Sequence, residues 1–159
     1  MILPDVLQGG LRVVFCGTAV GTRSAKVRAY YAGPGNSFWA TLHQIGLTPR
    51  QLLPAEYADL LRYGIGLTDL NKVTAGSDSE VGTGGFDVPQ LETKLEQCRP
   101  GWIAFNGKTA ARAALGRPVD YGAQRGRLGS TRVFVLPSTS GAARGFWDPR
   151  YWRHLAETI

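Results

Sequence analysis

Apolar residues along the chain follow two alternating patterns. Short continuous apolar runs are typical of buried strands, and longer segments with apolar residues every three or four positions are typical of helices. The predicted strands are residues 11–16, 65–70, 102–106 and 133–136. The predicted helices are residues 36–45, 54–63, 87–98 and 108–115, and a last helix opened by Asp148 and Pro149. Thr48-Pro-Arg-Gln51 also has the pattern of a capping box with proline at the first helical position.

Strands that alternate with helices favour parallel pairing through right-handed crossovers. We therefore expect an α/β fold, a three-layer α/β/α sandwich with a four-stranded parallel sheet. The chain shows no linker and no internal repeat, so residues 1–159 are expected to form a single domain. The glycine-rich segments 74–86 and 116–130 are expected to be irregular.

Charge and composition narrow the class of protein. The formal net charge is +6, and most of the basic residues are arginines, which suit bidentate contacts with phosphate. This balance fits a basic enzyme or a protein with a polyanionic partner such as nucleic acid. No apolar run reaches membrane-spanning length, and residues 1–10 lack the pattern of a signal peptide. An intracellular protein is expected, cytoplasmic and nucleoid-associated or nuclear, and not secreted.

Cysteine and histidine usage excludes two kinds of site. Two cysteines cannot form a disulfide network or a cysteine-rich cluster. The two histidines, His43 and His154, have no second metal ligand at helical spacing. We therefore expect neither a metal nor another cofactor.

Two loops of small residues directly follow buried strands. Gly17-Thr-Ala-Val-Gly21 follows the first strand, and Pro137-Ser-Thr-Ser-Gly-Ala-Ala-Arg144 follows the last one. The carboxyl ends of parallel strands are where α/β proteins bind ligands, and small residues let a ligand approach backbone N–H groups. The two loops are therefore expected to hold a ligand between them.

Common nucleotide-binding motifs do not fit these loops. Gly107-Lys-Thr109 resembles the end of a P-loop, but Trp102 stands where the first glycine of that motif is needed. The first loop also lacks the G-x-G-x-x-G spacing of dinucleotide-binding folds. An NTPase and an NAD-dependent enzyme are therefore not expected.

Four segments together resemble the mismatch-specific uracil/thymine-DNA glycosylase family of the uracil-DNA glycosylase superfamily. They are Phe15-Cys-Gly-Thr-Ala-Val-Gly21, Tyr31-Ala-Gly-Pro-Gly-Asn-Ser-Phe-Trp39, Gly64-Ile-Gly-Leu-Thr-Asp-Leu70 and Leu136-Pro-Ser-Thr-Ser-Gly-Ala-Ala-Arg144. Phe105-Asn-Gly-Lys108 is similar to a further family segment. The resemblance covers nearly the whole chain, and the family fold it implies is a parallel sheet sandwiched by helices.

The resemblance implies a monofunctional DNA glycosylase that starts base excision repair. Such an enzyme flips uracil, or another pyrimidine such as thymine, out of mismatched DNA and hydrolyses its N-glycosidic bond. The implied partner is double-stranded DNA with G·U or G·T mismatches, with single-stranded DNA as an open alternative. A monomer is expected.

The resemblance also assigns residues that bind the base. Backbone N–H groups around Gly17, Thr18 and Gly21 are suited to hold negative charge on the leaving base. Tyr31 matches the family aromatic residue that stacks on the flipped base, and core packing is its alternative role.

A second set of residues is expected to contact DNA. It comprises Ser24, Lys108, Ser138, Ser140, Gly141, Ala142, Ala143 and Arg144. The family often has a bulky residue where Ala142 or its neighbour stands, so these alanines are poor wedges for the duplex. Arg144 either compensates by contacting phosphate or base, or is a solvated surface charge.

The chain departs from the family at the residue that positions the attacking water. The family has an asparagine in the first loop where this chain has Ala19, and a methyl group cannot form hydrogen bonds. Either the protein is inactive or another residue holds the water. Asp69 is the first candidate, because a carboxylate at the end of the second strand can orient or deprotonate water and stabilise a cationic sugar. Capping a turn or pairing with an arginine is its alternative role, and Asn71 is the second choice.

Two other functions remain open at this point. A catalytically inactive relative that binds lesions or mismatches is favoured by Ala19. An enzyme acting on a free nucleoside or nucleotide is the other, although the excess of arginine argues against a small substrate.

Overall fold

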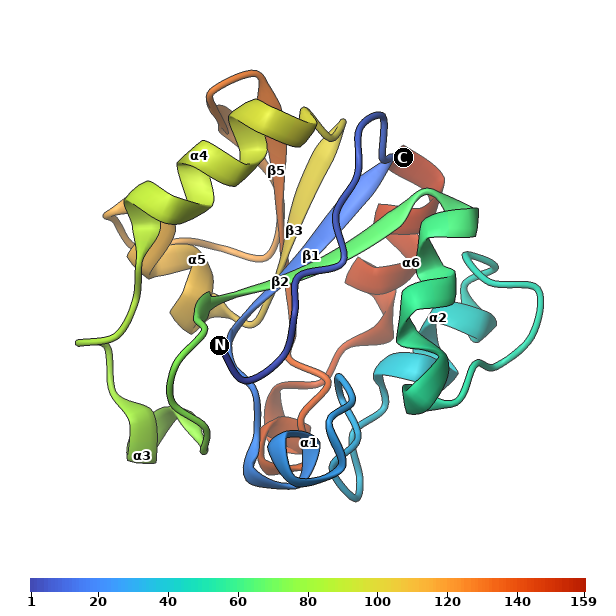
Figure 1. The fold of residues 1–159 in the computed structure, drawn as a ribbon. Helices are drawn as coiled ribbons and strands as arrows, with labels where there is room; N and C mark the ends of the chain where they lie inside the picture. The colour runs from blue at the N-terminus through green and yellow to red at the C-terminus, as the bar shows by residue number, and fades with distance from the viewer.

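A five-stranded sheet forms the middle layer of the protein, which is described for residues 1–159 by a computed structural model (Figure 1). The strand order is β2-β1-β3-β5-β4. The strands are β1 (Val13–Ala19), β2 (Ile65–Asn71), β3 (Trp102–Asn106), β4 (Gly122–Leu128) and β5 (Thr131–Leu136). Strand β1 is parallel to β2 and β3, and β3 is parallel to β5, whereas β4 is antiparallel to β5.

Helices cover both faces of this sheet. They are α1 (Thr22–Val27), α2 (Phe38–Gln44), the 3₁₀ helix η1 (Pro54–Tyr63), α3 (Asp78–Val81), α4 (Val88–Cys98), α5 (Lys108–Leu115), the 3₁₀ helix η2 (Gly141–Phe146) and α6 (Pro149–Thr158). In Figure 1, α4 and α5 lie on one side of the sheet and α2 and α6 on the other. The predicted α/β/α sandwich is therefore confirmed.

Two hydrophobic cores explain the continuous apolar runs of the central strands. Successive side chains of a strand point to opposite faces of the sheet. Phe15 of β1 packs in the core shared with α2, η1 and α6, and its neighbour Cys16 packs in the core shared with α4 and α5. A strand covered on both faces needs apolar residues at consecutive positions.

Strand β4 corrects the expected strand count. Residues 116–130 were expected to be irregular, but they contain β4, which pairs with β5 through a turn at Gly129 and Ser130. This edge strand is largely exposed, and its register shifts between Ala123 and Arg127. A strand with one paired edge and little burial does not need an apolar run, so its sequence lacks the pattern of the central strands.

The helix start predicted at Thr48 is also wrong. Thr48 is buried in a segment of bends, and the next helix begins at Pro54. There the Glu56 side chain accepts a hydrogen bond from the Leu53 N–H at 2.8 Å, as the acidic member of a capping box does. The segment 74–86 is likewise not wholly irregular, because it contains α3.

The N-terminal segment lies along the outer edge of β2. Val6 and Leu67 exchange two backbone hydrogen bonds of 2.9 Å each, and the Ile2 N–H donates to the Lys72 carbonyl at 2.9 Å. This segment therefore occupies an edge that would otherwise be unpaired. None of the helices combines the length and the apolarity needed to cross a bilayer.

Candidate functional site

A cleft of about 810 Å³ opens at the carboxyl ends of the parallel strands, and both small-residue segments border it as expected. The first segment is only partly a loop, because β1 extends to Ala19 and so includes Gly17 and Thr18. The cleft brings together most of the residues that the sequence analysis singled out. These are Gly17, Thr18, Gly21, Ser24, Tyr31, Asp69, Lys108, Ser138, Ser140, Gly141, Ala142 and Ala143. Asn71 and Arg144 do not line it.

Asp69 lies where β1 and β2 end side by side. The parallel register pairs Asp69 with Gly17, and Asp69 is 5% exposed. Its Oδ2 atom is buried without a hydrogen-bond partner, and the nearest ammonium, Lys72 Nζ, is 3.9 Å from it. Burial raises the pKa of Asp69 to about 6, although the charge of Lys72 acts to lower it. A carboxylate of this kind is well suited to accept a proton near neutral pH.

The glycine at position 17, near the end of β1, allows Asp69 to approach the β1 backbone. A Cβ atom there would lie 2.8 Å from Asp69 Oδ1 and 3.5 Å from Tyr31 Oη. The first of these contacts is too short for any side chain without displacement of the carboxylate. Gly17 therefore keeps both polar groups close to the β1 backbone.

Asn71, the second choice for the catalytic group, has a structural role. Its Nδ2 donates to Thr74 Oγ1 at 2.6 Å, and its Oδ1 accepts from the N–H groups of Val73 and Thr74 at 3.0 Å each. These bonds hold the turn after β2. The Asn71 amide is engaged in these hydrogen bonds, and the residue does not line the cleft. Asp69 is therefore the remaining catalytic candidate.

Tyr31 packs against the core and also faces the cleft. Its ring stacks on Phe38 with centroids 4.0 Å apart, and it also borders the cleft. Its Oη is buried without a partner, and burial followed by the charge of Asp69 raises the pKa of this hydroxyl. The backbone of Tyr31 is left-handed, with φ of 52°, a conformation that a bulky residue rarely adopts. The ring is therefore held in place by surrounding contacts.

Hydrogen bonds fix the loops around Tyr31 and Thr18. Ser24 Oγ is buried and accepts from the Ala32 N–H at 2.9 Å, which ties α1 to the loop that carries Tyr31. Thr18 Oγ1 donates to Asp78 Oδ1 at 2.6 Å, which joins the first loop to α3.

Asn106 is a cleft residue that the sequence analysis did not single out. Its Nδ2 donates to Thr139 Oγ1 at 3.0 Å, and its Oδ1 accepts from the Thr139 N–H at 3.0 Å. The pair connects the end of β3 to the loop after β5. A polar residue at the end of a buried strand, inside the segment Phe105-Asn-Gly-Lys108, was the signal that could have identified it.

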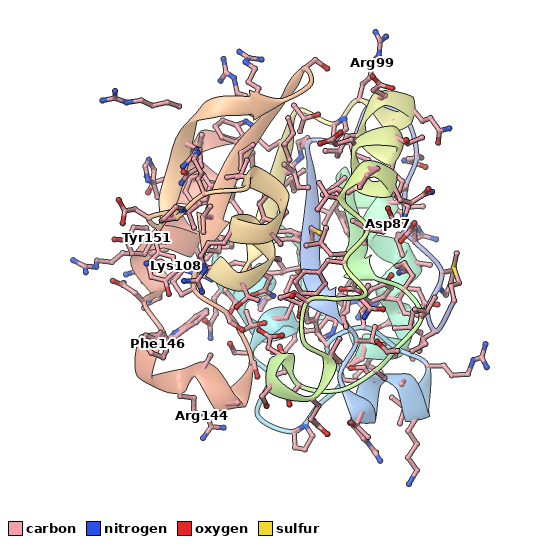
Figure 2. All side chains as sticks on the ribbon, turned by 90° about the vertical axis from the view of Figure 1, so that its left-hand side faces the viewer. Asp87, Arg99, Lys108, Arg144, Phe146 and Tyr151 are labelled. Atoms are coloured by element: carbon pink, nitrogen blue, oxygen red, sulfur yellow. The ribbon has the colours of Figure 1, made fainter.

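Basic and aromatic side chains gather at the rim of the cleft. Lys108 Nζ lies 4.4 Å from the centre of the Tyr121 ring, and Arg112 is nearby in the cleft lining. Phe146, at the end of η2, is 72% exposed and also lines the cleft. Figure 2 shows Lys108, Phe146 and Arg144 along the same side of the molecule. No group of three or more His, Cys, Asp or Glu side chains is arranged to hold a metal ion.

Comparison with known proteins gives matches that span this architecture. The family model of the uracil DNA glycosylase superfamily matches residues 4–156. The chain is also similar to a Methanosarcina acetivorans protein described as a candidate uracil DNA glycosylase, whose structure was solved by solution NMR. The two share 26% sequence identity, with a TM-score of 0.63 and 96% of each chain covered. Since the family model covers almost the whole chain, this protein belongs to the uracil-DNA glycosylase superfamily.

Proposed function

We propose that this protein is a monofunctional DNA glycosylase of the mismatch-specific type. Its substrate is uracil, with thymine and other pyrimidines as further candidates, flipped from mismatched DNA at the start of base excision repair. The observation that carries the proposal is Asp69, a buried carboxylate in the cleft with one oxygen free of hydrogen bonds. It supplies a proton acceptor that Ala19 cannot supply.

The proposed reaction is hydrolysis by a water molecule bound to Asp69. The bond between C1′ of the sugar and the base nitrogen breaks, and its electron pair leaves with the base. The water oxygen forms the new bond to C1′, the water proton passes to Asp69, and the base anion takes a proton from solvent. The negative charge of Asp69 stabilises the cationic character that develops on the sugar.

The cleft offers groups for the leaving base. Gly17, Thr18 and Gly21 line the space, and backbone N–H donors from this segment would stabilise negative charge that develops on the base. Tyr31 supplies an aromatic ring at the same wall, supported from behind by Phe38. We propose that this ring stacks on the flipped base.

The rim is proposed to hold the DNA around the flipped nucleotide. The contacts to DNA come from Ser24, Lys108, Ser138, Ser140, Gly141, Ala142, Ala143 and Arg144, as the resemblance implies, with Arg112 and Phe146 added from the structure. Phe146 is the bulky residue that Ala142 and Ala143 do not provide. An apolar side chain of this size can enter the space left by the flipped base.

Single-turnover excision of uracil from a G·U duplex tests the proposal. The wild-type protein should leave abasic sites that alkali converts to strand breaks. Asp69→Ala and Asp69→Asn should lower the rate by roughly 10²–10⁴, the usual contribution of a general base. A folded Asp69→Ala variant with a rate near that of the wild type would remove Asp69 from the mechanism.

Ala19 favours a second candidate, a relative that binds mismatches without cleaving the glycosidic bond. Such a protein would retain a mismatched duplex in a binding assay but leave no alkali-sensitive sites. Binding that weakens steeply with salt would support DNA over a free nucleotide, because several phosphate contacts release counterions.

A further inference from the structure

Asp69 belongs to a cluster of four charged side chains, and the other three lie on the side of Asp69 away from Gly17. The cluster consists of Asp5, Asp69, Lys72 and Lys94. All four are largely buried, with side-chain exposures of 16% for Asp5, 4% for Asp69 and 13% for each lysine. Charges are rarely buried unless they are paired, and here two carboxylates match two ammonium groups.

Lys72 links Asp69 to the rest of the cluster. Its Nζ lies 3.0 Å from Asp5 Oδ1 and 3.9 Å from Asp69 Oδ2. The same ammonium donates to Tyr30 Oη at 2.9 Å. These contacts fix the cation beside the one Asp69 oxygen that has no hydrogen-bond partner.

Asp5 is itself held firmly, although it comes from the N-terminal segment. Lys94 Nζ of α4 lies 2.7 Å from Asp5 Oδ2, and Thr68 Oγ1 of β2 donates to Asp5 Oδ1 at 2.7 Å. Burial acts to raise the pKa of Asp5, but the hydrogen bonds and charges of Lys94 and Lys72 outweigh it and lower that pKa. Asp5 is therefore an anion that anchors Lys72.

We propose that Lys72, anchored by Asp5, is a positioning residue that keeps Asp69 ionised and in place for proton transfer. The inference rests on the proposed function of Asp69 as the group that activates water. It gives the N-terminal segment a part in catalysis, because that segment carries Asp5 to the back of the cleft.

The other titratable groups around Asp69 do not contribute charge. Burial raises the pKa values of the Cys16 thiol and of the Tyr30 and Tyr31 hydroxyls, so all three are neutral near pH 7. The ionisation of Asp69 is thus governed by burial, three charges and a hydrogen bond from the Gly17 backbone. Lys72 and Lys94 lower the pKa of Asp69, and Asp5 raises it.

Two substitutions should shift the acid limb of the excision pH profile in opposite directions. In Lys72→Met the limb should move up by about one pH unit or more, the usual effect of removing an adjacent opposite charge. At pH 6 a shift of one unit corresponds to a roughly fivefold loss of rate beyond any loss seen at pH 9. In Asp5→Asn the limb should move to lower pH, because a like charge near Asp69 is removed while the amide oxygen at position 5 still accepts from Lys72.

Conservative and distant substitutions provide the controls. Lys72→Arg keeps the positive charge and should therefore retain most of the wild-type pH profile of excision. Arg99→Gln also removes one positive charge, but Figure 2 shows Arg99 at the opposite end of the molecule from Arg144, so this variant should leave the profile unchanged. A merely structural role of Lys72 would lower the melting temperature without moving the profile, and that result would overturn the inference.

A direct titration separates this inference from the proposed function. The pKa of the Asp69 carboxyl, followed by ¹³C NMR of the folded protein, should rise in Lys72→Met and fall in Asp5→Asn. If these pKa values move but the excision profile does not, the coupling stands and Asp69 is not the group that activates water. If neither Lys72→Met nor Asp5→Asn moves the NMR pKa, the inference is wrong. Asp5→Asn keeps this test available should Lys72→Met not fold.

Discussion

Gly17 and Asp69 face each other at the ends of two parallel strands, and the carboxylate occupies the space that a side chain at position 17 would need. A Cβ atom on Gly17 would lie 2.8 Å from Asp69 Oδ1. The end of β1 thus contributes to the site through the absence of a side chain. Its small residues do more than admit a ligand, because one of them makes room for the proposed catalytic group.

Gly17→Ala should therefore displace Asp69 and slow excision by at least tenfold. Overpacking of a buried site of this kind also costs about 1–3 kcal/mol of stability. Single-turnover kinetics and thermal unfolding measure the two effects. Gly9→Ala is the matched control, because a Cβ atom at Gly9 meets nothing within 4 Å. Wild-type kinetics in Gly17→Ala would show that the position of Asp69 does not matter.

Asp69→Asn should make the protein more stable at pH 8 while lowering the excision rate by roughly 10²–10⁴. The pKa of Asp69 is about 6 in the folded protein and about 3.9 in an unfolded chain, so folding favours the protonated form. Stability therefore falls as the pH rises from about 4 to about 6 and stays lower above that range. The asparagine variant should gain roughly 1–3 kcal/mol over the wild type at pH 8 and almost nothing at pH 4.

Thermal unfolding of both proteins at the two pH values tests this difference. A gain in stability that is the same at pH 4 and pH 8 would mean that the ionisation of Asp69 is not its source.

Tyr31→Phe and Tyr31→Ala should separate the contribution of the Tyr31 ring from that of its hydroxyl. The hydroxyl is buried without a partner, so Tyr31→Phe should keep the excision rate within about threefold and raise stability by up to about 1 kcal/mol. Tyr31→Ala removes the stacking surface, which is worth about 1–3 kcal/mol per base, and should weaken substrate binding at least fivefold. A large loss of rate in Tyr31→Phe would instead assign the hydroxyl a catalytic role.

Phe146→Ala should impair excision from duplex DNA far more than from single-stranded DNA. Phe146 is exposed at the rim of the cleft, and a wedge is needed only where a base pair must be opened. The expected loss on a duplex is about tenfold or more, or about 1.4 kcal/mol. Leu53→Ala is the matched control, because Leu53 is 65% exposed and does not line the cleft. An equal loss on both substrates would exclude the wedge role.

The central architecture was predictable because β1, β3 and β5 are buried on both faces and therefore carry continuous apolar runs. Strand β4 (Gly122–Leu128) was not predicted for the opposite reason. It is an exposed edge strand, so its sequence has no apolar run that would indicate a strand. At Thr48, local capping chemistry suggested a helix start that the structure lacks, whereas the helix predicted over residues 54–63 is present.

The site could be predicted only in part. Strand order and the rule that ligands bind at carboxyl ends were enough to bring Asp69 and the two loops to one edge. The salt bridges between Asp5 and Lys72 and between Asp5 and Lys94 were not predictable, because they join the N-terminal segment to the residue after β2 and to α4 across long sequence separations. The commitment of Asn71 to a turn likewise became visible only with the backbone around it.

Both edges of the sheet discourage the addition of a strand from another molecule. The outer side of β2 is occupied where Val6 pairs with Leu67, and β4 at the other edge is irregular in register and exposes Arg125 and Arg127. Covered edges and edges interrupted by charge resist intermolecular β-pairing. Removal of residues 1–6 would uncover one of these edges, and we expect it to make the protein prone to aggregation.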